Sequence, residues 1–346
     1  MTPRRALARV DLGAIERNCA LLPKPLCAVV KANGYGHGPV AGAALAGGAT
    51  WLAVATAGEA RELRDQGVDE PVLVLGALTR DELRIAVEAD ADVVAWSDAV
   101  AGAAPRVHVK LDTGMGRLGT KDREQALRLA AGPNVRGLMT HFATADERGD
   151  DLFPAQLEAF RDFVEAVGRE DLLVHAANSA AALRDPASHF DMVRCGIAIY
   201  GMDPFHEDPA AHGLEPALSL HSWVAAVRRF EPGDSAGYGR RWTAAEPCWV
   251  ATVPIGYGDG WRRGLTNDCD VLVRGRRHPV VGTVSMDSVT VALGADTEVE
   301  VGDPVVLIGR QGEERILAEA VARRLGTINY EVTTGLLPRV RREHVR

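Results

Sequence analysis

The chain has 346 residues, 47% of them apolar, and a formal net charge of −8. This length and composition exclude a disordered chain and allow a large hydrophobic core, most simply divided between two domains. The acidic balance disfavours duplex nucleic acid and anionic lipid as partners, since both bind through a basic protein face.

The N-terminal residues carry no sign of export. Charged side chains interrupt the apolar pieces of residues 1–11, so no secretory signal is expected, and no later apolar run is long enough to cross a bilayer. Five widely spaced cysteines, an odd number without a Cys-x-x-Cys pair, indicate free thiols and no zinc or other metal site. The sequence therefore predicts a cytoplasmic protein.

One pattern repeats through about residue 201. An apolar run is followed by a turn and by a segment rich in Ala, Leu, Glu and Arg with helical spacing. Eight such units predict an α/β fold with a closed parallel (β/α)8 barrel over residues 1–214, and a doubly wound open sheet is the competing arrangement. The expected strands cover residues 27–31, 51–56, 72–76, 92–97, 107–112, 135–142, 172–179 and 193–200.

The pattern changes after about residue 215. Alternating apolar and polar residues, separated by turns at 231–234 and 274–277, predict a mainly antiparallel β domain over residues 215–346. No low-complexity linker precedes it, so a firm interface with the barrel is expected. The predicted elements are strands at 218–227, 248–254, 270–274 and 279–284, and a helix at 316–325 that ends at Gly326.

Lys31 ends the first apolar run and opens a glycine-rich turn. The chain has 39 lysines and arginines, but only four of them are lysines. A guanidinium cannot replace an amine that must lose its proton and attack a carbonyl, so a lysine retained here indicates Schiff-base chemistry. The ordinary alternative is a lysine that caps the strand and reaches solvent.

Other polar residues lie where the predicted barrel strands end. Chemistry in such barrels collects at the C-terminal ends of the strands, which makes these residues candidates for an active site. A single one could be a helix cap or a barrel plug. The set comprises Lys110 with Asp112, His141, Asn178 with Ser179, and Arg194 with Gly196.

Eight segments in chain order together resemble the alanine racemases, a family that holds pyridoxal phosphate in a fold type III barrel. The resemblance covers essentially the whole chain. It implies an enzyme that interconverts L-alanine and D-alanine through a pyridoxal-phosphate aldimine and supplies D-alanine for peptidoglycan. The segments are residues 28–38, 109–119, 140–143, 178–179, 193–201, 256–260, 285–287 and 328–331.

The resemblance implies two catalytic residues, because racemisation needs an acid–base group on each face of a planar intermediate. Lys31 would serve the D-enantiomer and Tyr257 the L-enantiomer. His141 would lie beside the tyrosine, and Arg194 beside the histidine. The alternative for Tyr257 is an interface aromatic that is bonded through its hydroxyl group.

The same resemblance implies a cofactor site. Arg194 would face the pyridine nitrogen and keep it unprotonated, which limits side reactions; its alternative is a salt bridge at the barrel rim. Hydroxyl and backbone N–H groups near a glycine turn suit a phosphate dianion. The implied phosphate ligands are Tyr35, Ser179, Gly196, Ile197 and Tyr330.

A second cationic pair is implied for the substrate. Arg117 would bind the carboxylate and the cofactor's phenolic oxygen, and the backbone N–H of Met286 would bind the same carboxylate. Lys110 commonly carries a carbamate in this family, which would make it an anion that orients Arg117. The ordinary alternative is a surface ion pair between Lys110 and Asp112.

The resemblance also implies a head-to-tail homodimer in which Tyr257 and Met286 complete the partner's site. The sequence departs from the family at Gly34 and Gly258, which replace alanines and predict slightly looser turns, and in the tail at residues 333–340. The alternatives are a racemase with broader substrate range, a fold type III decarboxylase and a non-catalytic pyridoxal-phosphate carrier.

Overall fold

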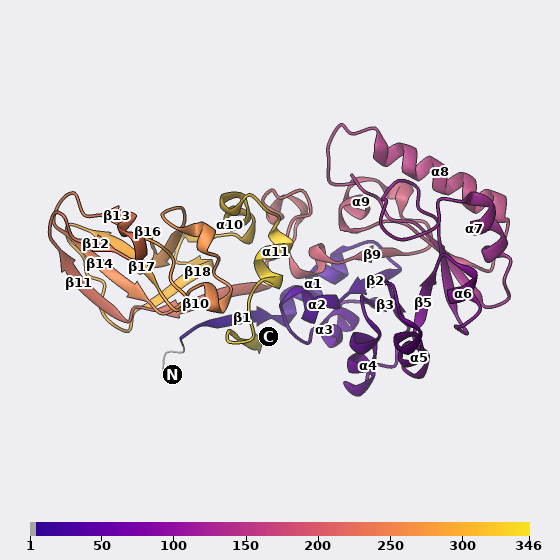
Figure 1. Cartoon of the computed structure of the whole chain (residues 1–346), viewed down its shortest axis with the longest axis horizontal. Coiled ribbons are helices and arrows are strands. Elements are labelled where there is room, and N and C mark those ends of the chain that lie inside the picture. The colour runs from indigo at the N-terminus through magenta and orange to yellow at the C-terminus, as the bar shows by residue number, and fades with distance from the viewer. Residues whose placement is uncertain (1–4) are drawn as a thin grey trace.

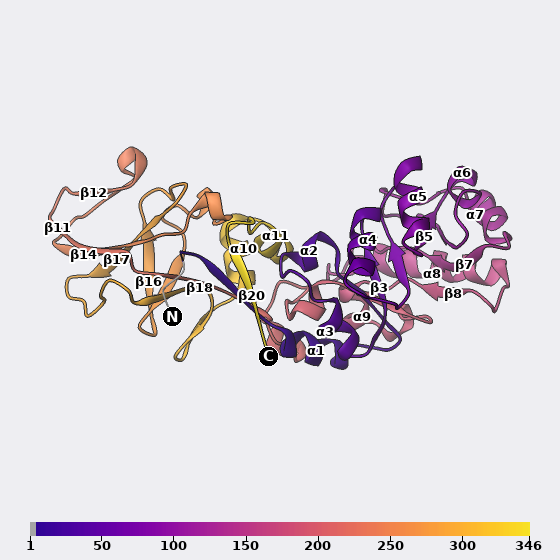
Figure 2. The same cartoon turned by 90° about the horizontal axis from the view of Figure 1, so that it is seen from below.

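The computed structural model describes residues 5–346 and shows two regions that lie end to end along the longest axis of the molecule (Figures 1 and 2). The barrel region contains the strands β2 to β9 with their helices. The antiparallel region contains β1 and β10 to β20. Two short helices, α10 (Ala318–Leu325) and α11 (Asn329–Thr334), lie between the regions in both views.

The barrel region confirms the eight predicted parallel strands. They follow one another around the sheet in chain order, and the last strand pairs with the first, with Leu26 opposite Val193. Two backbone hydrogen bonds of 2.9 Å, Asp191 N to Val174 O and Arg194 N to Ala177 O, link the two remaining edges. The strands are β2 (Leu26–Val29), β3 (Ala49–Val54), β4 (Val72–Val74), β5 (Asp92–Ala95), β6 (Val107–Lys110), β7 (Val135–Met139), β8 (Leu173–His175) and β9 (Val193–Cys195).

Local sequence explains where the barrel helices begin. Thr56 and Thr79 each accept a hydrogen bond from the backbone of a glutamate three residues later, whose side chain binds back to the threonine N–H. Such reciprocal caps satisfy N–H groups that a helix start leaves free. The helices are α1 (Leu12–Leu21), α2 (Lys31–Tyr35), α3 (Ala41–Ala46), α4 (Ala57–Asp65), α5 (Arg80–Glu88), α6 (Asp98–Ala101), α7 (Arg123–Ala130), α8 (Leu152–Val167) and α9 (Ser179–Arg184).

The antiparallel region has more strands than the sequence predicted. The expected strand at 218–227 is two strands, because the chain leaves the sheet at Val224 and Ala225. The order is β11-β14-β17-β16-β15-β18-β10-β1-β20, with β19 on β18 and a separate β12–β13 pair. The strands are β10 (Leu218–Trp223), β11 (Ala226–Phe230), β12 (Ser235–Ala236), β13 (Trp242–Thr243), β14 (Cys248–Val253), β15 (Asp270–Val273), β16 (Arg276–Val281), β17 (Val289–Gly294), β18 (Pro304–Gln311), β19 (Glu314–Ile316) and β20 (Arg341–Val345).

The first strand, β1 (Leu7–Asp11), belongs to the antiparallel region although it precedes the barrel in the chain. It pairs antiparallel with β10 and parallel with β20. The two sheets therefore do not separate at one point of the sequence, and the division at residues 214 and 215 stays a prediction. Among residues 5–346, the structure has no helix that is both long and apolar enough to span a bilayer.

Candidate active site

A cavity of about 450 Å³ opens at the C-terminal ends of the barrel strands, where the sequence placed the chemistry. It is lined by the predicted site residues except Asp112, Tyr257 and Met286. Tyr330 reaches it from α11, so the segment between the two regions completes one wall. The predicted residues in the lining are Lys31, Tyr35, Lys110, Arg117, His141, Ser179, Arg194, Gly196, Ile197 and Tyr330.

The segment after Lys31 is a left-handed turn. Ala32, Asn33, Gly34 and Tyr35 have φ values of 53°, 53°, 58° and 51°. This conformation costs about 1–2 kcal/mol per residue with a Cβ, so three of the four are strained and the glycine is not. Gly34 thus removes strain, which differs from the looser turn expected from the sequence.

Polar side chains hold the strained turn in place. Glu59 accepts hydrogen bonds from the backbone N–H groups of Ala32 at 2.6 Å and Ala55 at 2.8 Å, and so ties the turn to the end of β3. The fully buried ring of His37 bonds through Nδ1 to the carbonyl oxygens of Gly34 and Tyr35. Burial lowers the pKa of His37 to about 4, so the ring is neutral.

The surroundings of Lys31 favour the unprotonated amine more than solvent does. Burial and, after it, the positive charge of Arg117 lower its pKa below the usual lysine value. A lysine in this state is a better nucleophile, because the unprotonated amine carries the reactive lone pair. The alternative of a strand cap that reaches solvent does not describe a partly buried lysine that lines this cavity.

Next to the hydroxyl group of Tyr35, Ser179 and Gly196 form a small polar corner. The Ser179 hydroxyl accepts from the N–H of Gly196 at 3.0 Å. Asn178, not Ser179, caps α9, since its side chain accepts from the N–H of Ala181. A Cβ on Gly196 would stand 2.3 Å from the Tyr35 hydroxyl oxygen, so glycine permits this close approach.

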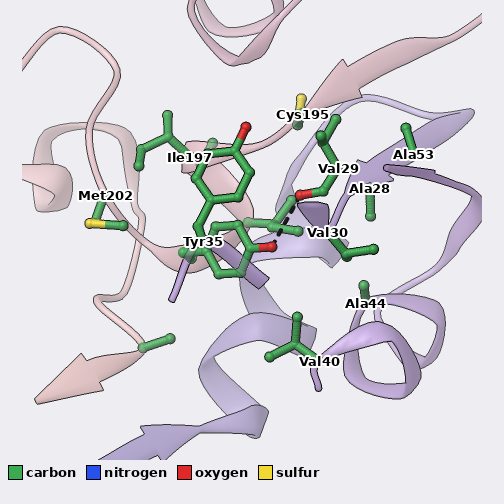
Figure 3. Close-up of a cluster of buried hydrophobic side chains, with 14 of the residues drawn as sticks. Ala28, Val29, Val30, Tyr35, Val40, Ala44, Ala53, Cys195, Ile197 and Met202 are labelled. Carbon is green, nitrogen blue, oxygen red and sulfur yellow. Dashed lines mark hydrogen bonds between the residues drawn. The ribbon is translucent and has the colours of Figure 1, made fainter. Parts of the chain in front are cut away.

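Tyr35 is held by packing. Its ring stacks on Tyr200 at 4.9 Å between centroids and meets Tyr330 at 6.0 Å. Figure 3 shows it among side chains of β2 and of the segment after β9, with Val29 and Ile197 beside it. Burial raises the pKa of Tyr35 above its usual value, so its hydroxyl stays a donor. The polar corner of Ser179 and Gly196, together with the hydroxyl groups of Tyr35 and Tyr330, suits an anion.

Arg194 lies almost fully buried beneath the cavity. Its Nη2 donates to the carbonyl oxygens of Thr140 at 2.8 Å and Ala176 at 2.9 Å, and lies 3.3 Å from Nδ1 of His141. The pKa of His141 lies well below the usual histidine value, mainly because the ring is buried and secondly because of the positive charge of Arg194. No salt bridge joins Arg194 to a carboxylate among residues 5–346, so the rim ion pair considered for it is wrong.

Lys110 is buried, and its environment is electropositive. Burial and then the charges of Arg194 and Arg117 lower its pKa to about 8. The carboxylate of Asp112 instead accepts hydrogen bonds from backbone N–H groups in the following glycine turn. The alternative of a Lys110–Asp112 surface pair is therefore wrong.

Tyr257 and Met286 lie side by side in the antiparallel region. The backbone N–H of Tyr257 donates to Ser285 O at 3.1 Å, and that of Gly258 donates to Met286 O at 2.8 Å. Both side chains are exposed, at 38% and 51%. Neither lines the cavity of its own chain, so their predicted roles require that the cavity be completed by a second copy.

Ion pairs hold these two loops together. The buried carboxylate of Asp259 accepts from the guanidinium groups of Arg5 at 2.8 Å and Arg339 at 3.0 Å. Both arginines also contact Asp287 beside Met286. Tyr257 and Met286 are thus exposed on loops that these ion pairs hold in place.

Some residues that shape the site were not predicted. Asn329 anchors α11 by donating to Asp203 O at 2.8 Å and to Glu319 at 2.9 Å, and so fixes Tyr330. His175 contacts Arg194 from β8. A single histidine within an otherwise apolar run was a signal for the latter. Within residues 5–346, no group of three or more His, Cys, Asp or Glu side chains is arranged to hold a metal ion.

Comparison with known proteins gives consistent matches. The family model described as "Alanine racemase, N-terminal domain" matches residues 10–204, and "Alanine racemase, C-terminal domain" matches residues 217–344. The chain is 41% identical to alanine racemase 1 of Bacillus subtilis, covering 98% of this chain and 92% of the relative. It is 44% identical to alanine racemase of Geobacillus kaustophilus, with 95% and 91% covered.

Solved structures agree with these matches. The alanine racemase of E. faecalis superposes with a TM-score of 0.92 at 38% identity, covering 99% of this chain and 98% of that one. The biosynthetic alanine racemase of Pseudomonas aeruginosa gives a TM-score of 0.91 at 37% identity, with both chains fully covered.

Proposed function

The chain belongs to the alanine racemase family, and from this premise we propose that it interconverts L-alanine and D-alanine with pyridoxal phosphate as cofactor. The observation that carries the proposal is that one cavity is lined both by the partly buried Lys31 and by the polar corner of Ser179 and Gly196, which suits an anion. Its physiological role would be to supply D-alanine for peptidoglycan.

The residues present fit pyridoxal phosphate. Lys31 would hold the aldehyde carbon, and Tyr35, Ser179 and Tyr330 would hold the phosphate with the N–H groups of Gly196 and Ile197. Without a Cβ, Gly196 leaves the space that such close backbone contact needs. When bound, the cofactor withdraws electrons from the amino acid's α-carbon and makes its hydrogen acidic.

Two groups of the protein would then move the proton. Lys31 Nζ removes or delivers it on one face, and the hydroxyl oxygen of Tyr257 does so on the other. Because Tyr257 and Met286 do not line the cavity of their own chain, we expect a head-to-tail homodimer in which each copy completes the other's site.

Other side chains would orient the reactants. Arg194 would face the pyridine nitrogen as a permanent cation, and its contact with His141 would extend to the partner subunit's Tyr257. Arg117 would bind the substrate carboxylate, joined by the N–H of the partner subunit's Met286. A carbamate on Lys110 fits its lowered pKa, because the neutral amine is the form that attacks carbon dioxide.

A mixing experiment tests the shared site. Lys31→Ala and Tyr257→Phe should each lose racemisation of L-alanine, measured by chiral chromatography. If each site draws on two chains, mixed dimers regain one intact site, so random mixing restores about a quarter of the sites. No recovery in a mixture shown to exchange subunits would contradict the shared site, and undiminished activity of either variant would contradict the two-base assignment.

The alternatives make different predictions. A non-catalytic carrier would bind the cofactor and leave the optical rotation of L-alanine unchanged; the match of the C-terminal family domain to residues 217–344 disfavours it. A decarboxylase would release carbon dioxide. A broader racemase would invert serine or basic amino acids as fast as alanine, which a panel of substrates tests. We expect the enzyme in the cytoplasm, since its five cysteines are free and four are buried.

A further inference from the structure

A line of polar side chains crosses the interior of the barrel beneath the active site. Asp92 on β5, His108 on β6, His175 on β8 and Arg194 on β9 are all buried, with exposures of 5%, 0%, 0% and 3%. Barrel interiors are usually filled by branched apolar residues. Four buried polar side chains in contact therefore require a physical account.

The contacts form a continuous chain. Nη1 of Arg194 lies 2.8 Å from Nδ1 of His175, and Nε2 of His175 lies 2.7 Å from Nδ1 of His108. Nε2 of His108 lies 3.1 Å from Oδ2 of Asp92. The other carboxylate oxygen accepts from Nε of Arg106 at 2.5 Å. This line of hydrogen-bonded side chains thus runs from the active-site cavity to a second cavity at the N-terminal ends of the barrel strands, which Asp92 and Arg106 line.

The direction of donation follows from the ends. Arg194 can only donate, so Nδ1 of His175 must accept and the proton of that neutral ring lies on Nε2. That proton is donated to Nδ1 of His108, which leaves the His108 proton on Nε2, facing the carboxylate of Asp92. Each assignment fixes the next, and every ring nitrogen in the chain has a partner.

The barrel makes room for this chain. A Cβ added to Gly137 on β7 would stand 2.5 Å from Nδ1 of His108 and 2.5 Å from Leu173 O. Burial alone would raise the pKa of Asp92, but hydrogen bonds from His108 and Arg106 outweigh it and hold that pKa below its usual value. The far end of the chain is therefore an anion.

We propose that Asp92, His108 and His175 are positioning residues that hold Arg194 in one orientation as a cation, through hydrogen bonds that all point from Arg194 toward Asp92. This inference rests on the proposed function, in which Arg194 faces the cofactor's pyridine nitrogen. Burial lowers the pKa of Arg194 to about 10. The carboxylate of Asp92, linked to Arg194 through the two histidines, therefore helps to keep the guanidinium charged.

The direct test needs no variant. In the holoenzyme labelled with ¹⁵N in histidine, long-range ¹H–¹⁵N spectra should show His108 and His175 as neutral rings with the proton on Nε2. A proton on Nδ1 of either ring would overturn the proposal. This result does not depend on alanine turnover. If these tautomers were found in a protein that did not racemise alanine, the proposed function would be wrong, but the hydrogen-bonded line from Arg194 to Asp92 would be confirmed.

A matched pair of variants tests the effect on function. Asp90 and Asp92 both contact Arg106, but Asp90 is exposed and touches neither histidine. Asp92→Asn should lower kcat about tenfold with little change in KM, and should move the ¹⁵N shift of a labelled cofactor pyridine nitrogen, whereas Asp90→Asn should do neither. If the two variants behaved alike, the hydrogen-bonded side chains would have only a packing role, and the proposal would be wrong.

A conservative substitution separates the acceptor from the link. His175→Asn can place an amide oxygen near the position of Nδ1 and still accept from Arg194, whereas His175→Phe cannot. We expect the asparagine variant to retain about tenfold more activity than the phenylalanine variant. The reverse order, with both variants folded, would overturn the role of His175 as the acceptor for Arg194.

Discussion

The barrel region and the antiparallel region present their site residues in opposite ways. In the barrel region, Lys31 and Arg194 lie at or just beyond strand ends, are partly or almost fully buried, and line a cavity of their own chain. In the antiparallel region, Tyr257 and Met286 stand exposed on loops that ion pairs hold. One region is a prepared pocket, and the other is a surface that gains its proposed role only against a second copy.

The largest expected effect is in the barrel region. Lys31→Arg keeps a positive charge but removes the amine, so racemisation should fall by at least about 10⁴-fold. Chiral analysis of alanine measures it, with Lys121→Arg as the control, since Lys121 is exposed and does not line the cavity. Residual turnover within tenfold of the wild type would show that charge alone suffices at Lys31.

The next effect is in the antiparallel region. Tyr257→Phe removes one hydroxyl from an exposed side chain, so racemisation should fall by about 10²- to 10⁴-fold while stability hardly changes. Activity and thermal unfolding together measure this. Tyr238→Phe is the control, because Tyr238 is also an exposed tyrosine of this region. A large loss of stability in Tyr257→Phe would point instead to a structural role for its hydroxyl.

Acid should weaken the barrel region more than the antiparallel region. Burial lowers the pKa of His37 to about 4 and keeps those of His141 and His175 well below the usual value. Burial shifts His221 and His278 of the antiparallel region in the same direction. Unfolded histidines titrate near about 6.5, so below that pH the unfolded chain binds more protons and is favoured.

This pH effect has a measurable size. His37 alone should lower the free energy of unfolding by about 3 kcal/mol between pH 6.5 and 4, and the loss is complete only below its folded pKa. Urea titrations across this window, at one protein concentration, measure it, and the slope should be shallower in His37→Asn. A free energy of unfolding that does not change over the window would contradict the neutral buried rings.

The smallest expected effect concerns the turn after Lys31. Gly34→Ala places a Cβ at φ +58°, where it also approaches Val40 Cγ2 to 3.1 Å, and should destabilise the protein by about 1 kcal/mol. Gly42→Ala is the control, because it lies in α3 with open space around the added Cβ, and it should be neutral or stabilising. Equal stability of the two variants would show that the turn adjusts without strain.

Periodicity in the sequence predicted the barrel strands, because it reflects local alternation of apolar runs and helical segments. The ends of those strands predicted Lys110 and Arg194 in the cavity, whereas Arg117 and Tyr330 followed only from the resemblance to the alanine racemases. Periodicity could not predict that β1 pairs with β20, since Arg9 and Glu343 form their contact across 334 positions of sequence. Strands β17 and β18 were missed, although apolar residues alternate along β17 and form a continuous run in β18.

The buried line from Asp92 to Arg194 shows a different limit. Single polar residues in apolar strands, such as His108, were visible in the sequence, but their contacts depend on the closure of the barrel and on the missing side chain at Gly137. The exposed loop of Tyr257 likewise depends on contacts between distant residues, since Arg5 and Arg339 both bind Asp259 beside it.

The pairing of β1 with β20 has a consequence for biosynthesis. The ribosome makes β1 first and β20 last, and β10 emerges only after the whole barrel has left the exit tunnel. The opening strand must therefore wait until the barrel has been made before β10 can pair with it, and until the end of translation before β20 can do so. A circular permutant that begins just before β2 and carries β1 and α1 behind β20 would shorten that wait. It should give a higher yield of folded protein when chaperones that act at the ribosome are depleted.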